Sequence, residues 1–133
     1  KKYTISDNIL VADYKFSEIL IISELFFGLE ININPETDIS SSRYLMIDKK
    51  KISFKSDICE KNIGEIEIHC DDLNFSLGLS SQIPFELWSY PIKAVSQSES
   101  GFELTYQGTT LLFKWNFDDV RNGVELTLRY NSM

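Results

Sequence analysis

The stretches FELTYQGTTLLFKWNF (residues 102–117) and VELTLRY (residues 124–130) decide the fold, because large apolar side chains occupy alternate positions in both. Successive side chains of a strand point to opposite faces of its sheet, so this alternation predicts half-buried strands. A two-residue turn at Gln107–Gly108 and a loop at 118–123 would place these apolar residues on one face. The expected pairs are Leu104 with Leu111, Phe102 with Phe113, Phe117 with Val124, and Trp115 with Leu126.

The middle of the chain, residues 43–79, predicts a second meander of the same kind. Its turns are expected at 49–50, 61–63 and 71–72. The last of these turns pairs Ile68 with Phe75 and Ile66 with Leu77, so that the apolar residues again share one face.

Two meanders that are each apolar on one face can bury those faces only against each other or by closing. Residues 1–133 therefore predict a mainly β, single-domain antiparallel β-sandwich or flattened barrel built from two meanders. Between the meanders, residues 84–95 form another extended segment. Because Pro91 cannot donate to a ladder, this strand ends there or lies at an edge.

The N-terminal third leaves two alternatives open. Residues 17–27 fit one short helix, with Ser17 as N-cap and Gly28 just past its end, and they fit a strand equally well. Residues 29–33 are a strand in both cases. Residues 3–11 predict one strand that is interrupted at Asp7–Asn8.

The predicted register also separates the two cysteines. Cys70 points to the apolar face and Cys59 to the outer face, which excludes a disulfide bridge between them. Free thiols are typical of a reducing compartment, so we expect a cytoplasmic protein.

Charge and motifs exclude several classes of function. The chain holds 20 acidic and 13 basic residues, a net charge of −7, which argues against nucleic acid as a partner. No apolar run reaches the roughly 20 residues of a membrane span, so no membrane partner is expected. His69 is the only histidine, and no metal-ligand spacing or phosphate-binding glycine pattern occurs. We therefore expect no cofactor, no metal and no enzymatic activity.

Acidic residues cluster between positions 57 and 72, where Lys61 is the only basic residue. In the predicted register Asp57 lies across from Glu67, and like charges placed opposite each other cost stability. Such a surface is either an ordinary solvated strand face or the contact surface for a basic partner. The six acids are Asp57, Glu60, Glu65, Glu67, Asp71 and Asp72.

Two exposed aromatic residues are predicted on the segment 84–95. Trp88 and Tyr90 lie on the face opposite to Phe85 and Leu87, so one of the two pairs points away from the core. The exposed pair either belongs to a covered edge strand or forms a surface for a ligand or partner.

The whole-chain profile of small size, acidic charge and no catalytic motif resembles small acidic bacterial immunity proteins of contact-dependent-inhibition and polymorphic toxin systems. This resemblance implies a non-enzymatic binder that covers the active site of a basic, nuclease-type toxin. The six clustered acids would then contact lysines and arginines of the toxin. Trp88 and Tyr90 would be the aromatic anchors, since buried aromatics dominate interface energies.

Two other functions stay open. The chain is alternatively a carbohydrate- or small-ligand-binding β-sandwich that uses Trp88 and Tyr90 as a stacking surface. An enzyme built on the paired carboxylates Glu65 and Glu67, about 7 Å apart on one strand face, is the third.

Overall fold

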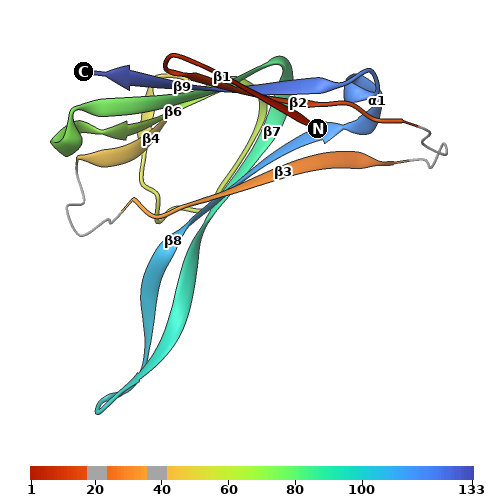
Figure 1. Ribbon diagram of the computed structural model, residues 1–133. Coiled ribbons are helices and arrows are strands. Elements are labelled where there is room, and N and C mark those ends of the chain that lie inside the picture. The colour runs from red at the N-terminus through yellow and green to blue at the C-terminus, as the bar shows by residue number, and fades with distance from the viewer. Residues whose placement is uncertain (18–23, 36–41) are drawn as a thin grey trace.

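The computed structural model describes residues 1–17, 24–35 and 42–133 and is almost entirely antiparallel β-structure (Figure 1). This confirms the predicted mainly β fold. The elements are β1 Lys2–Ser6, β2 Ile9–Tyr14, β3 Phe26–Ile33, β4 Arg43–Ile47, β5 Lys50–Ile52, β6 Ile58–Cys70, a 3-10 turn Asp71–Leu73, β7 Phe75–Ser98, β8 Gly101–Asn116, α1 Phe117–Val120 and β9 Val124–Ser132.

The strands form two layers that share β6 and β7. In the upper layer of Figure 1 the order is β1-β2-β9-β7-β6-β4-β5, where β7 contributes residues 75–80 and β6 residues 65–70. In the lower layer the first half of β6 pairs with the second half of β7, which pairs with β8, and β8 pairs with β3. Among the described strands β1 and β3 each have one neighbour, so the sheet stays open and the flattened-barrel alternative is not formed.

Strand β6 changes layers at a bulge. The register between β6 and β7 shifts on both sides of Ile63, and Asn62 adopts a left-handed conformation with φ 60°. Asparagine tolerates this conformation, and a bulge bends the strand that carries it. The loop predicted at 61–63 is therefore wrong, because these residues form a bend inside one strand.

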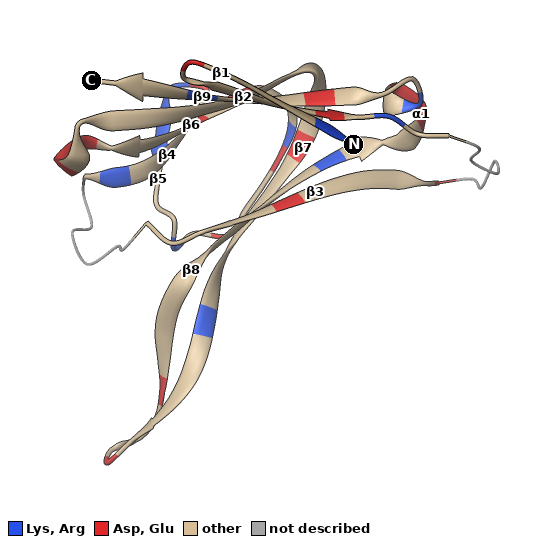
Figure 2. Cartoon of the chain, in the orientation of Figure 1, with Lys and Arg blue, Asp and Glu red and all other residues tan. Residues whose placement is uncertain are grey.

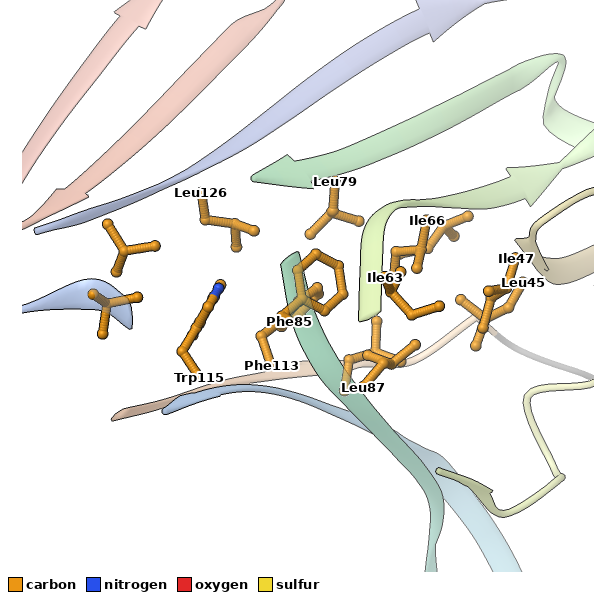
Figure 3. Close-up of a cluster of buried hydrophobic side chains, with 14 of the residues drawn as sticks. Leu45, Ile47, Ile63, Ile66, Leu79, Phe85, Leu87, Phe113, Trp115 and Leu126 are labelled. Atoms are coloured by element: carbon orange, nitrogen blue, oxygen red, sulfur yellow. The ribbon is translucent and has the colours of Figure 1, made fainter. Parts of the chain in front are cut away.

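The core lies between the two layers (Figure 3). Leu126, Leu79 and Ile66 point down from the upper layer, while Trp115, Phe113 and Leu87 point up from the lower layer. All six are at least 95% buried. The indole nitrogen of Trp115 donates to the carbonyl of Ile83 at 2.9 Å, which satisfies the one polar group that this side chain brings into the core.

Alternation predicted the buried face of residues 111–117 and 124–126 correctly, but it predicted wrong strand partners. Strand β8 runs without a turn through Gln107–Gly108, and the hairpin turn between β7 and β8 lies at 99–100. Strands β8 and β9 do not pair; α1 separates them, and they pair with different parts of β7. The expected pairs Leu104–Leu111 and Trp115–Leu126 are therefore not formed.

Gly108 is needed for a close approach rather than for a turn. A Cβ atom at this position would lie 2.6 Å from the carbonyl oxygen of Ile33, where β3 ends beside β8. This contact is with backbone, which cannot rotate away as a side chain would. Glycine is therefore required at position 108 because the backbone of β3 approaches too closely to leave room for a side chain.

Three further turns differ from the prediction without changing the buried faces. The turn predicted at Asp71–Asp72 spans 71–74, so Ile68 pairs with Leu77 instead of Phe75. A shift of two residues preserves which side chains point inward. The turn predicted at 49–50 lies at 48–49, where both residues have positive φ. Residues 3–11 form a hairpin of β1 and β2 rather than one strand, because Asp7 turns the chain with φ 49°.

The remaining predictions concern the cysteines and the N-terminal third. Both cysteines are free; Cys70 is buried and Cys59 is exposed, as predicted. The predicted strand at 29–33 lies within β3. The choice between helix and strand for 17–27 falls largely on residues 18–23, which lie outside the described residues.

In the part of the chain that is described, no helix has the length and apolar character needed to cross a membrane.

We predict that Gly108→Ala destabilises the protein by about 1–3 kcal/mol, because the new Cβ overlaps the backbone of β3. Gly64→Ala is the matched control: a Cβ at Gly64 has no neighbour within 4 Å. This control should change the free energy of unfolding by less than about 1 kcal/mol. Urea denaturation of the two variants measures the difference, and equal stabilities would contradict the close approach.

Candidate functional site

The outer face of the lower layer carries exposed aromatic side chains. Along β7, Phe85 and Leu87 are buried in the core, whereas Trp88 and Tyr90 point outward with 40% and 41% of their surfaces exposed. Pairing of β7 with β6 ends at Ser89, so among the described strands Pro91 lies on a free edge of the sheet, one of its two predicted positions.

A third aromatic side chain joins this face from β3. Phe26 is 48% exposed, and the ammonium group of Lys114 lies 4.1 Å from its ring centre and 5.3 Å from the ring centre of Trp88. Cations over aromatic faces are attracted by the ring quadrupole. We call Phe26, Trp88 and Tyr90, together with Lys114 and Glu86, the aromatic platform.

Glu86 organises the centre of the platform. Its carboxylate accepts a hydrogen bond from the indole nitrogen of Trp88 at 2.7 Å, and it lies 3.6 Å from the ammonium group of Lys114. The indole N–H bond first, and the charge of Lys114 in addition, lower the pKa of Glu86 below its ordinary value. The carboxylate is therefore ionised at neutral pH and can accept further hydrogen bonds.

An open cleft of about 470 Å³ adjoins the platform. Phe26, Glu86 and Lys114 belong to both, so the cleft continues the platform towards α1. The bulge that bends β6 also positions the side chain of Asn62 on this cleft. Its lining residues are Phe26, Lys61, Asn62, Pro84, Phe85, Glu86, Lys114, Trp115, Asn116 and Asp119.

Hydrogen-bonding groups also flank the other end of the platform. Thr110 on β8 is the register partner of both Tyr90 and Asn32. Its hydroxyl donates to the side-chain oxygen of Asn32 at 2.7 Å, and the amide of Asn32 donates to Glu30 at 2.9 Å. The outer face thus alternates aromatic surface with polar groups.

The structure divides the six clustered acids between the two layers. Asp57 precedes β6, and Glu60 lies on the first half of β6 in the lower layer. The other four lie on the second half of β6 or the 3-10 turn, in the upper layer. The predicted opposition of Asp57 and Glu67 is wrong, because Glu67 pairs with Met46 and Gly78. Figure 2 shows acidic and basic segments interspersed over both layers instead of one acidic face.

Several of these acids have partners within the chain. Arg43 donates to Asp72 at 2.6 Å and lowers the pKa of that carboxyl group. His69 lies 2.5 Å from Glu67 through Nε2 and 3.7 Å from Asp71 through Nδ1.

The carboxylate pair Glu65 and Glu67 lies away from the cleft. Neither residue is among those that line it. Glu67 is engaged by His69, and Glu65 is exposed on β6. The cleft beside the platform therefore does not enclose this pair.

Sequence reasoning found Trp88 and Tyr90 but missed Phe26, Glu86 and Lys114. These residues lie on three different strands and meet only through the pairing of β8 with both β3 and β7. The sequence did contain a signal for Lys114. It lies between Phe113 and Trp115, which point inward, and because successive side chains of a strand point to opposite faces, its ammonium group is expected on the outer face.

Comparison with known proteins gives a consistent result. The family model of the alpha-amylase/4-alpha-glucanotransferase C-terminal domain matches residues 1–128. The chain is 33% identical over 94 residues to alpha-amylase 1 of Dictyoglomus thermophilum, covering 71% of this chain and 13% of the amylase. It is 26% identical over 98 residues to an alpha-amylase of Pyrococcus horikoshii, covering 74% of this chain and 13% of that protein.

A solved structure agrees on the fold. The chain is similar to the 4-alpha-glucanotransferase of Thermococcus litoralis, with a TM-score of 0.53 and 16% identity. The match covers 99% of this chain and 22% of the glucanotransferase. This chain therefore spans a small part of each relative that it matches.

These matches overturn the resemblance to immunity proteins. The predicted function as a toxin inhibitor and the predicted basic toxin partner are both wrong, because the family match covers nearly the whole chain. Size and net charge report on solubility and non-specific association, and they carry no information on ancestry. The acids assigned to toxin binding also lie in two layers, and Glu67 and Asp72 are engaged within the chain.

We predict that Trp88→Phe raises the pKa of Glu86 towards its ordinary value, because the indole N–H that stabilises the carboxylate is lost. Tyr90→Phe is the control, since no hydrogen bond from Tyr90 lowers this pKa. Carbon-detected NMR titration of the Glu86 carboxyl group measures the shift. An unchanged or lowered pKa in Trp88→Phe would contradict the described hydrogen bond.

Proposed function

Since the chain belongs to the alpha-amylase/4-alpha-glucanotransferase C-terminal family, we propose that it is a non-catalytic domain that binds α-glucan for such an enzyme. The family description and the 13% and 22% shares of the matched enzymes support a role beside a larger catalytic part. The alternative function expected from the sequence, a carbohydrate-binding β-sandwich, is thereby the favoured one.

The observation that carries this proposal is the exposure of Trp88 and Tyr90 on the outer face of an ordered strand. A pyranose ring has an apolar face of C–H bonds and a rim of hydroxyl groups. The apolar face fits against an aromatic ring, and aromatic side chains contribute large contact areas. Two aromatic residues at positions i and i+2 are about 7 Å apart along the strand, so they can contact neighbouring sugar units.

Polar groups around the platform match the hydroxyl rim. The ionised carboxylate of Glu86 accepts hydrogen bonds, the ammonium group of Lys114 donates them, and the amides of Asn62 and Asn116 do both. The cleft of about 470 Å³ lies in the size range of small-molecule sites. A glucan chain can therefore lie across the platform with one end in the cleft.

The platform is held in place before any ligand binds. Glu86 fixes the indole of Trp88 through a hydrogen bond of 2.7 Å, and Lys114 lies against both Trp88 and Phe26. Side chains that are already ordered lose less entropy on binding, which favours affinity. This arrangement supports a binding surface over an incidental exposure of aromatic residues.

The unbridged thiols support a further proposal, that the protein works in a reducing, cytoplasmic compartment. Both Cys59 and Cys70 are free, and Cys59 is exposed to oxidants. Recovery of the protein from the secreted fraction of its source cells, with Cys59 oxidised, would contradict this proposal.

We predict that Trp88→Ala and Tyr90→Ala each weaken binding to a malto-oligosaccharide at least ten-fold, because each removes an aromatic contact surface. Tyr130→Ala is the matched control, since Tyr130 is 44% exposed but lies in the upper layer. Isothermal titration calorimetry with maltoheptaose measures the dissociation constants. The constants should hardly change with salt concentration, because the contacts are not ion pairs.

Two outcomes would contradict the proposed glucan site. One is an equal loss of affinity in Tyr130→Ala and Trp88→Ala. The other is the absence of binding by the wild-type chain at millimolar maltoheptaose.

A further inference from the structure

The hairpin of β7 and β8 extends beyond both layers as a narrow arm (Figure 1). We define the arm as residues 93–98 of β7 and 101–106 of β8. Six residues of strand give it a length of roughly 20 Å. Among the described strands, β7 has no second neighbour after Ser89, and β8 has none before Thr109. In the described chain the arm therefore has no strand neighbour; at its base the ammonium group of Lys55 lies 5.6 Å from the ring centre of Tyr106.

The two faces of the arm differ in character. One face carries Val95, Phe102 and Leu104, with 66%, 79% and 68% of their surfaces exposed. The opposite face carries Ala94, Ser96, Glu103 and Thr105, and the hydroxyl groups of Ser96 and Thr105 lie 3.4 Å apart on it. Such a division into an apolar and a polar face is typical of strands that have one face covered by other residues.

The apolar face of the arm continues the inner, core-facing side of the lower layer. Phe113 and Leu111 are buried on this side of β8. Towards the tip of the arm, Gln107 has no partner on β7 and forms a bulge, so Leu104 and Phe102 lie on the same side as Phe113 and Leu111. The upper layer covers the first two residues, whereas no described residue covers the last two. The apolar side of β7 and β8 thus extends roughly 20 Å beyond the end of the upper layer that covers it.

Neither a second copy nor a lipid surface fits this face well. Three side chains that bury at most about 200 Å² each offer about 600 Å², less than the roughly 800 Å² per partner of a stable interface. Anionic membranes attract lysine and arginine, but the arm and its turn carry one lysine, Lys93, against two acids, Glu99 and Glu103. A groove in a larger folded domain can instead enclose the apolar face together with both edges of the arm.

We propose that the apolar face of the arm docks into an apolar groove of a second folded domain in the same polypeptide. This rests on the proposed function, because the matched enzymes are far longer than this chain, which spans 13% of each amylase and 22% of the glucanotransferase. Docking extends the buried side of the lower layer across the domain boundary. The arm then fixes the orientation of the aromatic platform relative to the neighbouring domain.

Hydrogen–deuterium exchange tests this proposal on the complete natural polypeptide and on the 133-residue chain. Amides of residues 93–106 should exchange at least ten-fold more slowly in the complete polypeptide. The double variant Phe102→Ser, Leu104→Ser should remove this protection, whereas Ser96→Ala, Thr105→Ala on the opposite face should keep it. All four side chains are exposed, so circular dichroism should show the wild-type fold in both variants.

Four outcomes would overturn the proposal. Exchange of the arm could be equally fast in both polypeptides, or the gene could encode no further folded domain. Sedimentation velocity could show a dimer of the wild-type chain that Phe102→Ser, Leu104→Ser dissociates. Vesicles of phosphatidylcholine and phosphatidylglycerol could slow amide exchange of the arm in the 133-residue chain to the rate that is found in the complete polypeptide.

Glucan binding distinguishes this proposal from the proposed function. Phe102→Ser, Leu104→Ser should leave the dissociation constant for maltoheptaose within two-fold of wild type, because the arm lies outside the platform. Among the variants described, only Phe102→Ser, Leu104→Ser is expected to lose protection of the arm from hydrogen exchange while it keeps glucan binding. If wild-type arm protection is absent while glucan binding is present, only the docking proposal fails.

Discussion

The membership of β6 and β7 in both layers is the constraint on which the rest of the structure depends. The first half of β7 pairs with β9 above the core, and its second half pairs with β8 below it. The apolar sides of the two layers therefore face each other, and Phe85, Phe113 and Trp115 meet between them (Figure 3). The burial of these rings, together with the other apolar side chains of the core, removes apolar surface from water, which is the dominant favourable contribution to folding.

The candidate site follows from the same strand that builds the core. Because side chains alternate along β7, the burial of Phe85 and Leu87 forces Glu86, Trp88 and Tyr90 to the outer face. The pairing with β8 then brings Lys114 beside Glu86. The platform is thus rigid because its reverse side is the core, which is how a binding surface is best positioned.

Alternation in the sequence predicted which side chains share a face, but it could not predict which strands are neighbours or how far the covering layer reaches. The predicted burial of Phe102 and Leu104 is wrong, because both lie beyond that layer with 79% and 68% of their surfaces exposed. The faces of residues 111–117 were right although the turn at Gln107–Gly108 was wrong, because period two specifies a face and not a partner. Gly108 indicates either a turn or a close approach, and only the position of β3 distinguishes these. The acidic cluster between 57 and 72 was read as one surface, but the bend at Asn62 separates its members into two layers.

The most direct measurement of the central claim uses the two tryptophans of this chain as reporters. Trp88 lies on the platform with its indole N–H bonded to Glu86, and Trp115 is buried with its indole N–H bonded to Ile83. In nitrogen–proton NMR spectra with added maltoheptaose, the indole signal of Trp88 should shift clearly more than that of Trp115, which lines the cleft but keeps its indole N–H on the carbonyl of Ile83 inside the core. Shifts confined to upper-layer residues, or equal shifts of both indole signals, would contradict the account.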